Sequence, residues 1–202
     1  MADPRSMRSI ILCVVALVAL TALDLWTKAW AERDLSRARS SPVAPACMPD
    51  EHGQYSMQRL RAESIVLVPD YLELRYAENC GAAFGLLDDA PRWLRVVVFM
   101  GAGIVAIAAL LWMFVRGHGG KLFAVSVPLV ASGALGNMID RIRLGYVVDF
   151  IHFHIRDGFE WPTFNVADST ITVGVALLLL DGLRGPVARP APASEQPDAG
   201  KA

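Results

Sequence analysis

The sequence predicts an all-α membrane protein with four transmembrane helices and a small platform of extended strands outside the membrane. Two observations carry this prediction. Hydrophobic residues make up 54% of the 202-residue chain and charged residues only 19%, with a mean hydropathy of +0.39, whereas soluble domains carry about a quarter charged residues. The apolar residues also gather in long runs, and a run of about 20 residues crosses the hydrocarbon core as a helix.

The same composition excludes several other classes of protein. Nineteen Lys and Arg residues against twenty Asp and Glu residues give a net charge of −1, so the chain has no basic field to hold nucleic acid. Three cysteines without a CxxC spacing predict neither a disulfide scaffold nor a zinc site. The high apolar content excludes an intrinsically disordered chain.

The four predicted spans differ in how continuous they are. The stretches 96–115 and 122–139 contain no charged residue. The first and last stretches are shorter between charges, and we count their mostly apolar flanks as part of the spans. We predict helices over about residues 9–30, 93–115, 121–139 and 166–183.

The first span has a second interpretation. Two arginines precede its apolar stretch, as they do in a cleavable secretory signal. Asp24 and Lys28 are four residues apart, so they share one face of a helix and can form an ion pair. Trp26 and Trp30 suit the aromatic belt at a membrane interface. These residues favour a retained transmembrane helix over a signal peptide.

Positive charges at the ends of the spans predict the orientation of the chain. Lys and Arg occur before residue 9, within 116–121 and after residue 183, and a four-span topology puts these three places on one side. That side is cytoplasmic by the positive-inside rule. We therefore expect both termini in the cytoplasm and residues 31–92 and 140–165 outside, although 140–165 also carries arginines.

The first outer segment predicts the platform of strands. Residues 31–62 are rich in Ser, Arg, Ala and Pro, and we expect an irregular excursion. Residues 64–68 and 71–76 flank a Pro-Asp turn, and 71–76 alternates apolar and polar side chains, which is typical of a half-buried strand. Residues 147–155 are expected to add a third extended stretch.

The predicted domain organisation is simple. We expect residues 1–185 to form a single membrane-embedded domain. The Pro- and Ala-rich stretch 186–202 is expected to be a disordered cytoplasmic tail.

Polar and charged residues at the rims of the spans are candidates for a functional site, because they are costly in a membrane. Under the predicted topology these residues gather near the outer end of the bundle: Asp24, Lys28, Asn137, Asp140, Arg141, Asp149, Asn165 and Asp168. Asp140 and Arg141 are adjacent and favour a structural ion pair. The convergence predicts a site at the outer membrane interface.

Asp149 and Asp168 are the candidates for chemistry, since each lies among apolar neighbours. Two desolvated carboxylates that face each other hold one proton between them, so that one activates a water molecule while the other donates a proton. The alternative interpretation is that Asp168 only caps the fourth helix, as Asp commonly does.

The motifs around these residues resemble those of the lipoprotein signal peptidases, also called signal peptidase II, which are bacterial membrane aspartyl proteases. The motifs are Asp24-Leu-Trp-Thr-Lys28, Asn79-Cys-Gly-Ala-Ala-Phe-Gly85, Gly136-Asn-Met-Ile-Asp-Arg141 with Gly145-Tyr-Val-Val-Asp-Phe150, and Phe164-Asn-Val-Ala-Asp-Ser169. The resemblance runs in order from the first predicted span to the fourth. It implies a four-helix membrane bundle with a small extracytoplasmic β-cradle, in the bacterial cytoplasmic membrane.

The resemblance also implies residue roles. The catalytic pair would be Asp149 and Asp168, and the substrate-binding or supporting residues would be Asp24, Lys28, Asn79, Gly81, Asn137, Asp140, Arg141 and Asn165. The implied substrate is a prolipoprotein whose cysteine carries diacylglycerol, with membrane lipid as the other contact. No metal and no cofactor is implied, and we expect a monomer. The stretch 33–62 is longer than the family leads us to expect.

Other interpretations remain. In a small ion or solute transporter subunit the ionisable residues would line a path, but the inner halves of the second and third spans contain no polar residue that could continue it. His152 and His154 near Asp149 could bind a metal, yet the ligand set is incomplete. Under the predicted topology Cys47 and Cys80 both lie outside the membrane, where they form a disulfide or remain free thiols.

Overall fold

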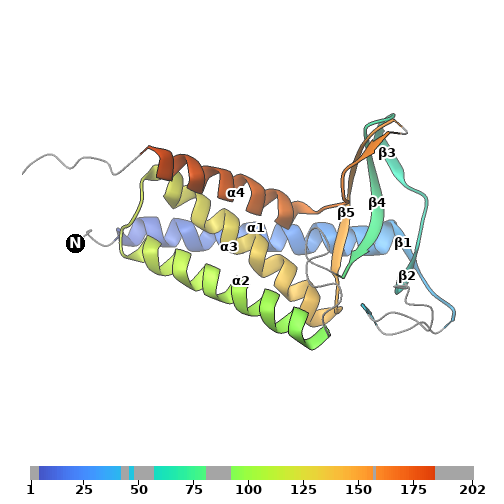
Figure 1. Ribbon diagram of the computed structural model, residues 1–202, viewed down its shortest axis with the longest axis horizontal. Helices are drawn as coiled ribbons and strands as arrows, with labels where there is room; N and C mark the ends of the chain where they lie inside the picture. The colour runs from blue at the N-terminus through green and yellow to red at the C-terminus, as the bar shows by residue number, and fades with distance from the viewer. Residues whose placement is uncertain (1–4, 42–45, 48–56, 81–91, 157, 185–202) are drawn as a thin grey trace, which may run out of the picture.

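Four helices form an elongated bundle, and a small β-sheet stands across one end of it (Figure 1). The computed structural model describes residues 5–41, 46–47, 57–80, 92–156 and 158–184. The start of the first helix and the end of the fourth both lie at the end of the bundle opposite the sheet (Figure 1). The helices are α1 (Met7–Asp34), α2 (Arg92–Val115), α3 (Lys121–Arg143) and α4 (Val166–Leu183).

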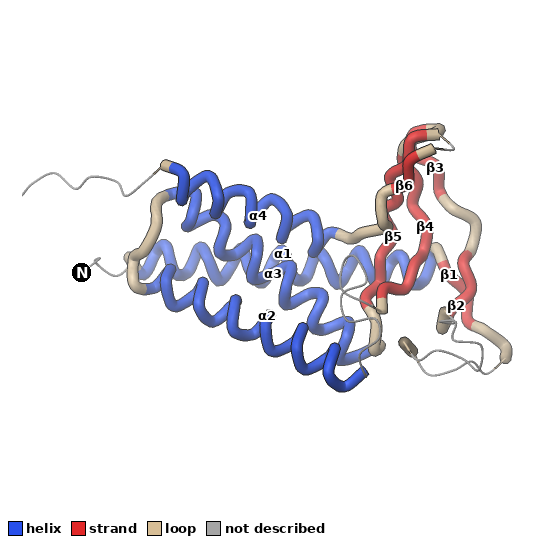
Figure 2. The backbone as a smooth tube through the Cα atoms, viewed as in Figure 1, coloured by secondary structure: helices blue, strands red, loops and turns tan. Residues whose placement is uncertain are grey.

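The strands form two antiparallel sheets (Figure 2). The larger has the order β3 (Ile65–Val68), β4 (Leu72–Asn79), β5 (Val147–Ile155) and β6 (Phe159–Glu160). The smaller pairs β1 (Ser36–Ala38) with β2 (Arg59–Arg61). The extended stretches predicted over 64–68, 71–76 and 147–155 are therefore confirmed as β3, β4 and β5, with β4 continuing to Asn79.

The expectation of an irregular excursion over 31–62 is partly wrong. α1 continues to Asp34, and both β1 and β2 fall in this stretch. The two short strands are held by long-range contacts that the local sequence does not reveal. The Arg59 Nε donates to the Ser36 Oγ over 2.6 Å, and the Arg61 Nε donates to the Tyr76 carbonyl over 2.8 Å.

The helices make this a membrane-type protein with a small β-sheet region. α1, α3 and α4 are each long and apolar enough to cross a membrane. In α2, the part from Met100 to Val115 is a shorter apolar helix over the residues searched. The tail predicted at 186–202 lies outside the described residues.

α3 packs against each of the other three helices, and small residues allow the close approach to α4. A Cβ atom placed on Gly133 would overlap the Ala167 carbonyl and the Thr170 hydroxyl, and one placed on Gly174 would overlap Val130. Small residues at helix contacts let backbones approach closely in membrane proteins, where packing drives association. The separation of α3 and α4 is thus set by glycines.

An apolar cluster joins the end of α1 to the larger sheet. Leu35 packs there with Tyr76 of β4 and with Val148 and Phe150 of β5, all of them buried. The Trp30 ring meets Phe150 edge to face, with 6.1 Å between the ring centres. This cluster fixes β5 relative to α1 and therefore fixes the polar residues that β5 carries.

Cys47 and Cys80 form a disulfide, with 5.2 Å between their Cα atoms. Of the two alternatives left open by the sequence, the structure contains the cross-link. Cys13 is a free thiol buried among apolar side chains of the bundle.

We predict that Gly133→Ala lowers the free energy of unfolding by about 1–3 kcal/mol, because the new methyl group must push α4 away from α3. Thermal unfolding in detergent micelles measures the change. Gly101→Ala on α2 is the matched control: no atom lies within 4 Å of its new Cβ, and alanine is the better helix former. Equal stability of Gly133→Ala and wild type would contradict the assigned packing.

Candidate active site

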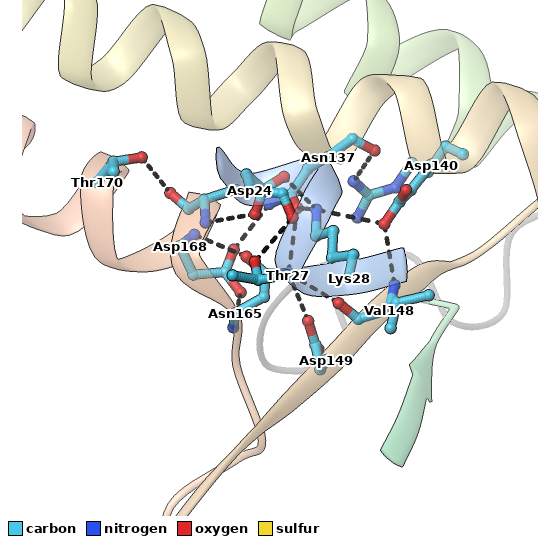
Figure 3. Close-up of polar contacts among 12 residues, drawn as sticks. Asp24, Thr27, Lys28, Asn137, Asp140, Val148, Asp149, Asn165, Asp168 and Thr170 are labelled. Carbon is cyan, nitrogen blue, oxygen red and sulfur yellow. Dashed lines mark hydrogen bonds and ion pairs between the residues drawn. The ribbon is translucent and has the colours of Figure 1, made fainter. Parts of the chain in front are cut away.

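A buried lysine stands at the centre of the polar residues at the sheet end of the bundle (Figure 3). The Lys28 Nζ lies 2.8 Å from Asp24 Oδ2 and 3.2 Å from Asp140 Oδ2. It also donates to the Asn137 Oδ1 over 2.8 Å. The Lys28 side chain is only 3% exposed, and the two carboxylates are 2% exposed. A buried ammonium group is tolerated here because two opposite charges and an amide oxygen surround it.

The two carboxylates around Lys28 each hold another part of the fold. The Ala167 backbone N–H, in the first turn of α4, donates to Asp24 Oδ1 over 2.8 Å. The Val148 N–H of β5 donates to Asp140 Oδ2 over 3.1 Å. Asp24 Oδ2 lies against the backbone of Gly136, where a Cβ would overlap it. One cluster thus connects α1, α3, α4 and β5.

Asn165 caps α4 and links the two candidate catalytic carboxylates. Its side-chain Oδ1 accepts from the Asp168 N–H over 2.9 Å, and the Asp168 Oδ2 accepts from the Asn165 N–H over 3.2 Å. This reciprocal arrangement is a capping box. Asp168 therefore does contribute to the helix cap, from the third helical position, and the chemical interpretation is not excluded by that contact.

Each oxygen of the two carboxylates has an amide donor. Asp149 accepts from the Asn165 Nδ2 over 2.6 Å and from the Asn79 Nδ2 over 3.0 Å, on different oxygens. Asp168 accepts from the Asn137 Nδ2 over 2.8 Å on Oδ1 and from the Asn165 backbone on Oδ2. Asn165 thus bridges the pair, and the amide groups fix the direction in which each carboxylate points.

The environment favours a proton on Asp149. Burial is the largest cause that raises the pKa of the Asp149 carboxyl, and the neighbouring charge of Asp168 acts in the same direction. Hydrogen bonds from Asn79 and Asn165 act in the opposite direction, and together these effects raise the pKa to about 7. Asp149 is only 2% exposed. A carboxyl group that holds its proton close to neutral pH is suited to general acid catalysis.

A cleft of about 600 Å³ opens beside the pair. Its polar lining comes from Asn79, Asn137, Arg141, Glu160, Thr163, Asp168 and Thr172. Its apolar lining comes from Val147, Phe159, Trp161, Pro162, Phe164 and Ile171. A second hollow, of about 360 Å³, also reaches Trp161, Phe164 and Asp168. Asp168 therefore lines both hollows, whereas the buried Asp149 lines neither.

The structure brings together almost all of the residues predicted from the sequence. Asp24, Lys28, Asn79, Asn137, Asp140, Asp149, Asn165 and Asp168 belong to one continuous hydrogen-bonded and ion-paired network. Arg141 lines the cleft and donates to the Asn137 carbonyl over 3.2 Å. Gly81 lies outside the described residues.

Three features of the site were not foreseen. Asp140 forms an ion pair with Lys28 of α1, whereas its sequence neighbour Arg141 was the expected partner. Trp161 and Phe164 line the cleft; Phe164 begins the fourth motif, but neither residue was a candidate for the site. His152 and His154 stack on each other with ring centres 5.3 Å apart, and no group of three or more metal-ligating side chains gathers among the described residues.

The fold and the site define a class: a helical membrane protein with two carboxylates, linked by Asn165, at one end of its bundle. A family model described as signal peptidase (SPase) II matches residues 15–184. The chain therefore belongs to the signal peptidase II family.

Curated relatives match more than half of the chain. The lipoprotein signal peptidase of Cupriavidus necator is 47% identical over 117 residues, which cover 58% of this chain and 66% of the relative. Those of Pseudomonas putida and Clostridium tetani are 44% identical over 119 residues and 36% identical over 127 residues, covering 59% and 62% of this chain and 70% and 79% of the relatives. The match thus spans just under two thirds of the Cupriavidus protein.

Solved structures have the same fold. One, described as a bacterial membrane enzyme at 2.3 Å resolution, superposes with a TM-score of 0.65 at 26% identity and covers 91% of this chain and 93% of its own. Another, described in the same words at 1.9 Å resolution, has a TM-score of 0.62 at 26% identity, covering 92% and 99%.

We predict that Lys28→Met destabilises the protein by about 3–5 kcal/mol, because it leaves two buried carboxylates without their cation. Thermal unfolding in detergent measures the loss. The double variant Lys28→Met/Asp24→Asn should recover part of it, since the amide oxygen can still accept from Ala167. Arg33→Met is the matched control: its ion pair with Asp34 is exposed, so we expect no measurable loss. A fully stable Lys28→Met protein would contradict the role of the cluster.

Proposed function

We propose that this protein is a lipoprotein signal peptidase, an aspartyl endopeptidase that removes the signal peptide from diacylglyceryl-modified prolipoproteins at the outer face of the bacterial cytoplasmic membrane. The observation that carries the proposal is the Asp149–Asn165–Asp168 arrangement beside a cleft at one end of an apolar bundle. Membership of the signal peptidase II family and the names of the curated relatives support it.

The proposed topology has four spans and both termini in the cytoplasm. α2 has 24 residues, enough to cross about 30 Å of hydrocarbon. The ends of α1 and α4 lie together at the end of the bundle away from the sheet (Figure 1), where Arg5 donates to the carbonyls of the turn between α2 and α3. The Cys47–Cys80 disulfide is at the sheet end, and an oxidising compartment outside the cytoplasm suits that end.

In this proposal residues 1–185 are a single membrane-embedded catalytic domain that works as a monomer in contact with membrane lipid. The cleft offers a lipid-modified peptide two kinds of contact. Aromatic and aliphatic side chains such as Phe164 and Ile171 suit apolar residues of the signal peptide. Asn79, Asn137 and Arg141 offer hydrogen-bond donors to its backbone and to the oxygen of the reacting carbonyl.

The two carboxylates divide the chemistry. Asp168 lines the cleft and takes a proton from a water molecule, whose oxygen adds to the carbonyl carbon before the lipidated cysteine. Asp149 donates its proton to the carbonyl oxygen, which gives a neutral tetrahedral diol. Asp168 then passes its proton to the departing nitrogen, the C–N bond breaks, and Asp149 recovers a proton from the diol hydroxyl. The cysteine leaves with a free amino group and both carboxyl groups return to their starting states.

The transporter interpretation is not favoured. The polar network is confined to the sheet end, and towards the other end an apolar cluster of Cys13, Phe114, Phe123 and Val127 fills the space between α1, α2 and α3. An ion path needs polar groups through the whole membrane, and these described side chains interrupt it.

We predict that Asp149→Asn and Asp168→Asn each reduce cleavage of a diacylglyceryl-modified substrate peptide by at least about 10³-fold, because a proton donor or acceptor is lost. Release of the signal peptide by purified protein in detergent measures the rate. Each variant should keep the wild-type thermal unfolding temperature to within a few degrees.

Asp70→Asn is the matched control for these variants. Asp70 lies in the turn between β3 and β4 with φ 66°, a conformation that Asn also tolerates. It should cleave at the wild-type rate. Near-normal cleavage by Asp149→Asn or Asp168→Asn would exclude that residue from the catalytic pair.

A further inference from the structure

One cysteine of the disulfide, Cys80, is next in the sequence to a residue of the candidate active site. Cys80 directly follows Asn79, the last residue of β4, and Asn79 donates to Asp149 Oδ2 over 3.0 Å. The other half, Cys47, comes from the segment between β1 and β2 and is 33 residues away in the sequence. The cross-link therefore attaches the active-site end of β4 to a distant part of the chain.

Cys47 is itself held in place by the side chains packed around it. It is 5% exposed and belongs to the apolar cluster with Leu35, Tyr76 and Val148. Its Sγ lies 3.3 Å from the Gly145 carbonyl oxygen, in the turn that leads into β5. Asp149 is carried by that same strand. The disulfide thus connects the end of β4 with the start of the strand that holds the partner of Asn79.

Backbone pairing with β5 holds this end of β4 over only a short length. The register between β4 and β5 shifts between Leu74 and Ala77, and Asn79 pairs with Val147 as the last pair of the ladder. Terminal pairs of a ladder open more readily than central ones. The Glu78 carboxylate also holds this end of β4, because it accepts from the N–H groups of Gln58 and Arg59. These contacts connect β4 to the start of β2 and not to β5.

We propose that the Cys47–Cys80 disulfide is a positioning device that holds the Asn79 amide against Asp149, so that full activity requires the oxidised form of the protein. The proposal rests on the function proposed above. Cys47 and Cys80 act through Asn79 and do not touch the reacting atoms. Reduction, which adds two electrons and two protons from a dithiol to give two thiols, frees the end of β4 and weakens the donor to Asp149.

The direction of the effect on Asp149 follows from the hydrogen bond. An N–H donor stabilises the ionised carboxylate, and the Asn79 contact lowers the pKa of Asp149 against the effect of burial. Loss of the contact therefore raises that pKa. A purely structural cross-link would lower the unfolding temperature without moving the titration of Asp149.

The experiment compares four full-length proteins in detergent: wild type, Cys47→Ser/Cys80→Ser, Asn79→Ala and the triple variant. Serine suits position 47, since its hydroxyl can donate to the Gly145 carbonyl. Carbon-13 NMR of labelled aspartate side chains, assigned with Asp149→Asn, follows the titration of Asp149. Cleavage of a diacylglyceryl-modified peptide gives kcat and KM. Cys13→Ala, which removes the buried free thiol of the bundle, is the matched control and should match wild type.

We expect the cysteine double variant to raise the pKa of Asp149 and to lower kcat about tenfold, with a smaller change in KM. The triple variant should match Asn79→Ala, because the two changes remove the same interaction. Reduction of wild type with dithiothreitol should reproduce the shift and reoxidation should reverse it, which separates positioning from misfolding. The double variant should not respond to the reductant.

Two results would overturn the proposal: an Asp149 titration that is the same with and without the disulfide, or cysteine and Asn79 effects that add in full. A different result would count against the proposed function alone. If wild type releases no signal peptide but its Asp149 titration depends on the disulfide, the cross-link positions Asn79 and the assigned reaction is wrong.

Discussion

The ion pairs of Lys28 are the interaction on which the rest of the structure depends. An ammonium group buried at the end of a membrane bundle is costly unless opposite charges and hydrogen-bond acceptors surround it. Asp24, Asp140 and Asn137 provide them. Because those groups come from α1 and α3, and because Asp24 and Asp140 in turn accept from the backbones of α4 and β5, four elements must meet at one place for the charge to be satisfied.

The geometry of the candidate catalytic residues depends on the place where these four elements meet. Once α4 begins beside Asp24, its capping residue Asn165 lies between β5 and α3, and its amide reaches Asp149. Asn137 contacts Lys28 through its oxygen and Asp168 through its nitrogen, so one side chain couples the Lys28 cluster to the proposed catalytic pair. Burial of Asp149 and the nearby charge of Asp168 permit one carboxyl group to remain protonated near neutral pH, against the effect of the amide donors.

The sequence predicted the helices well, because long apolar runs leave few alternatives to a membrane span. The positions of β3 and β4 followed from alternation in 71–76 and from a Pro-Asp turn, and 147–155 was expected as a third extended stretch, which is β5. β1 and β2 did not follow, since their pairing depends on Arg59 and Arg61 contacts with residues that are distant in the sequence. Local patterns carry no information on such contacts.

The candidate site, like the fold, could be predicted from the sequence only in part. The polar residues of the site were predicted from their cost in a membrane and from the motifs. The ion-pair partner of Asp140 was not predicted, because proximity in the sequence favoured Arg141 over Lys28. Ala167 and Val148 take part through their backbone N–H groups, which the identity of their side chains does not reveal. The need for glycine at 136 becomes visible only when Asp24 is seen against it. The disulfide remained one of two alternatives until the structure placed both cysteines beside each other.

In the proposed function Asp149 and Asp168 act as one pair with a shared proton. The most direct test is the dependence of kcat on pH for the full-length protein in detergent, with a saturating diacylglyceryl-modified peptide. Because Asp149 is the proposed proton donor and its pKa is about 7, we expect kcat to fall as the pH rises through this value. A kcat that stays constant as the pH rises well past 7 would contradict it.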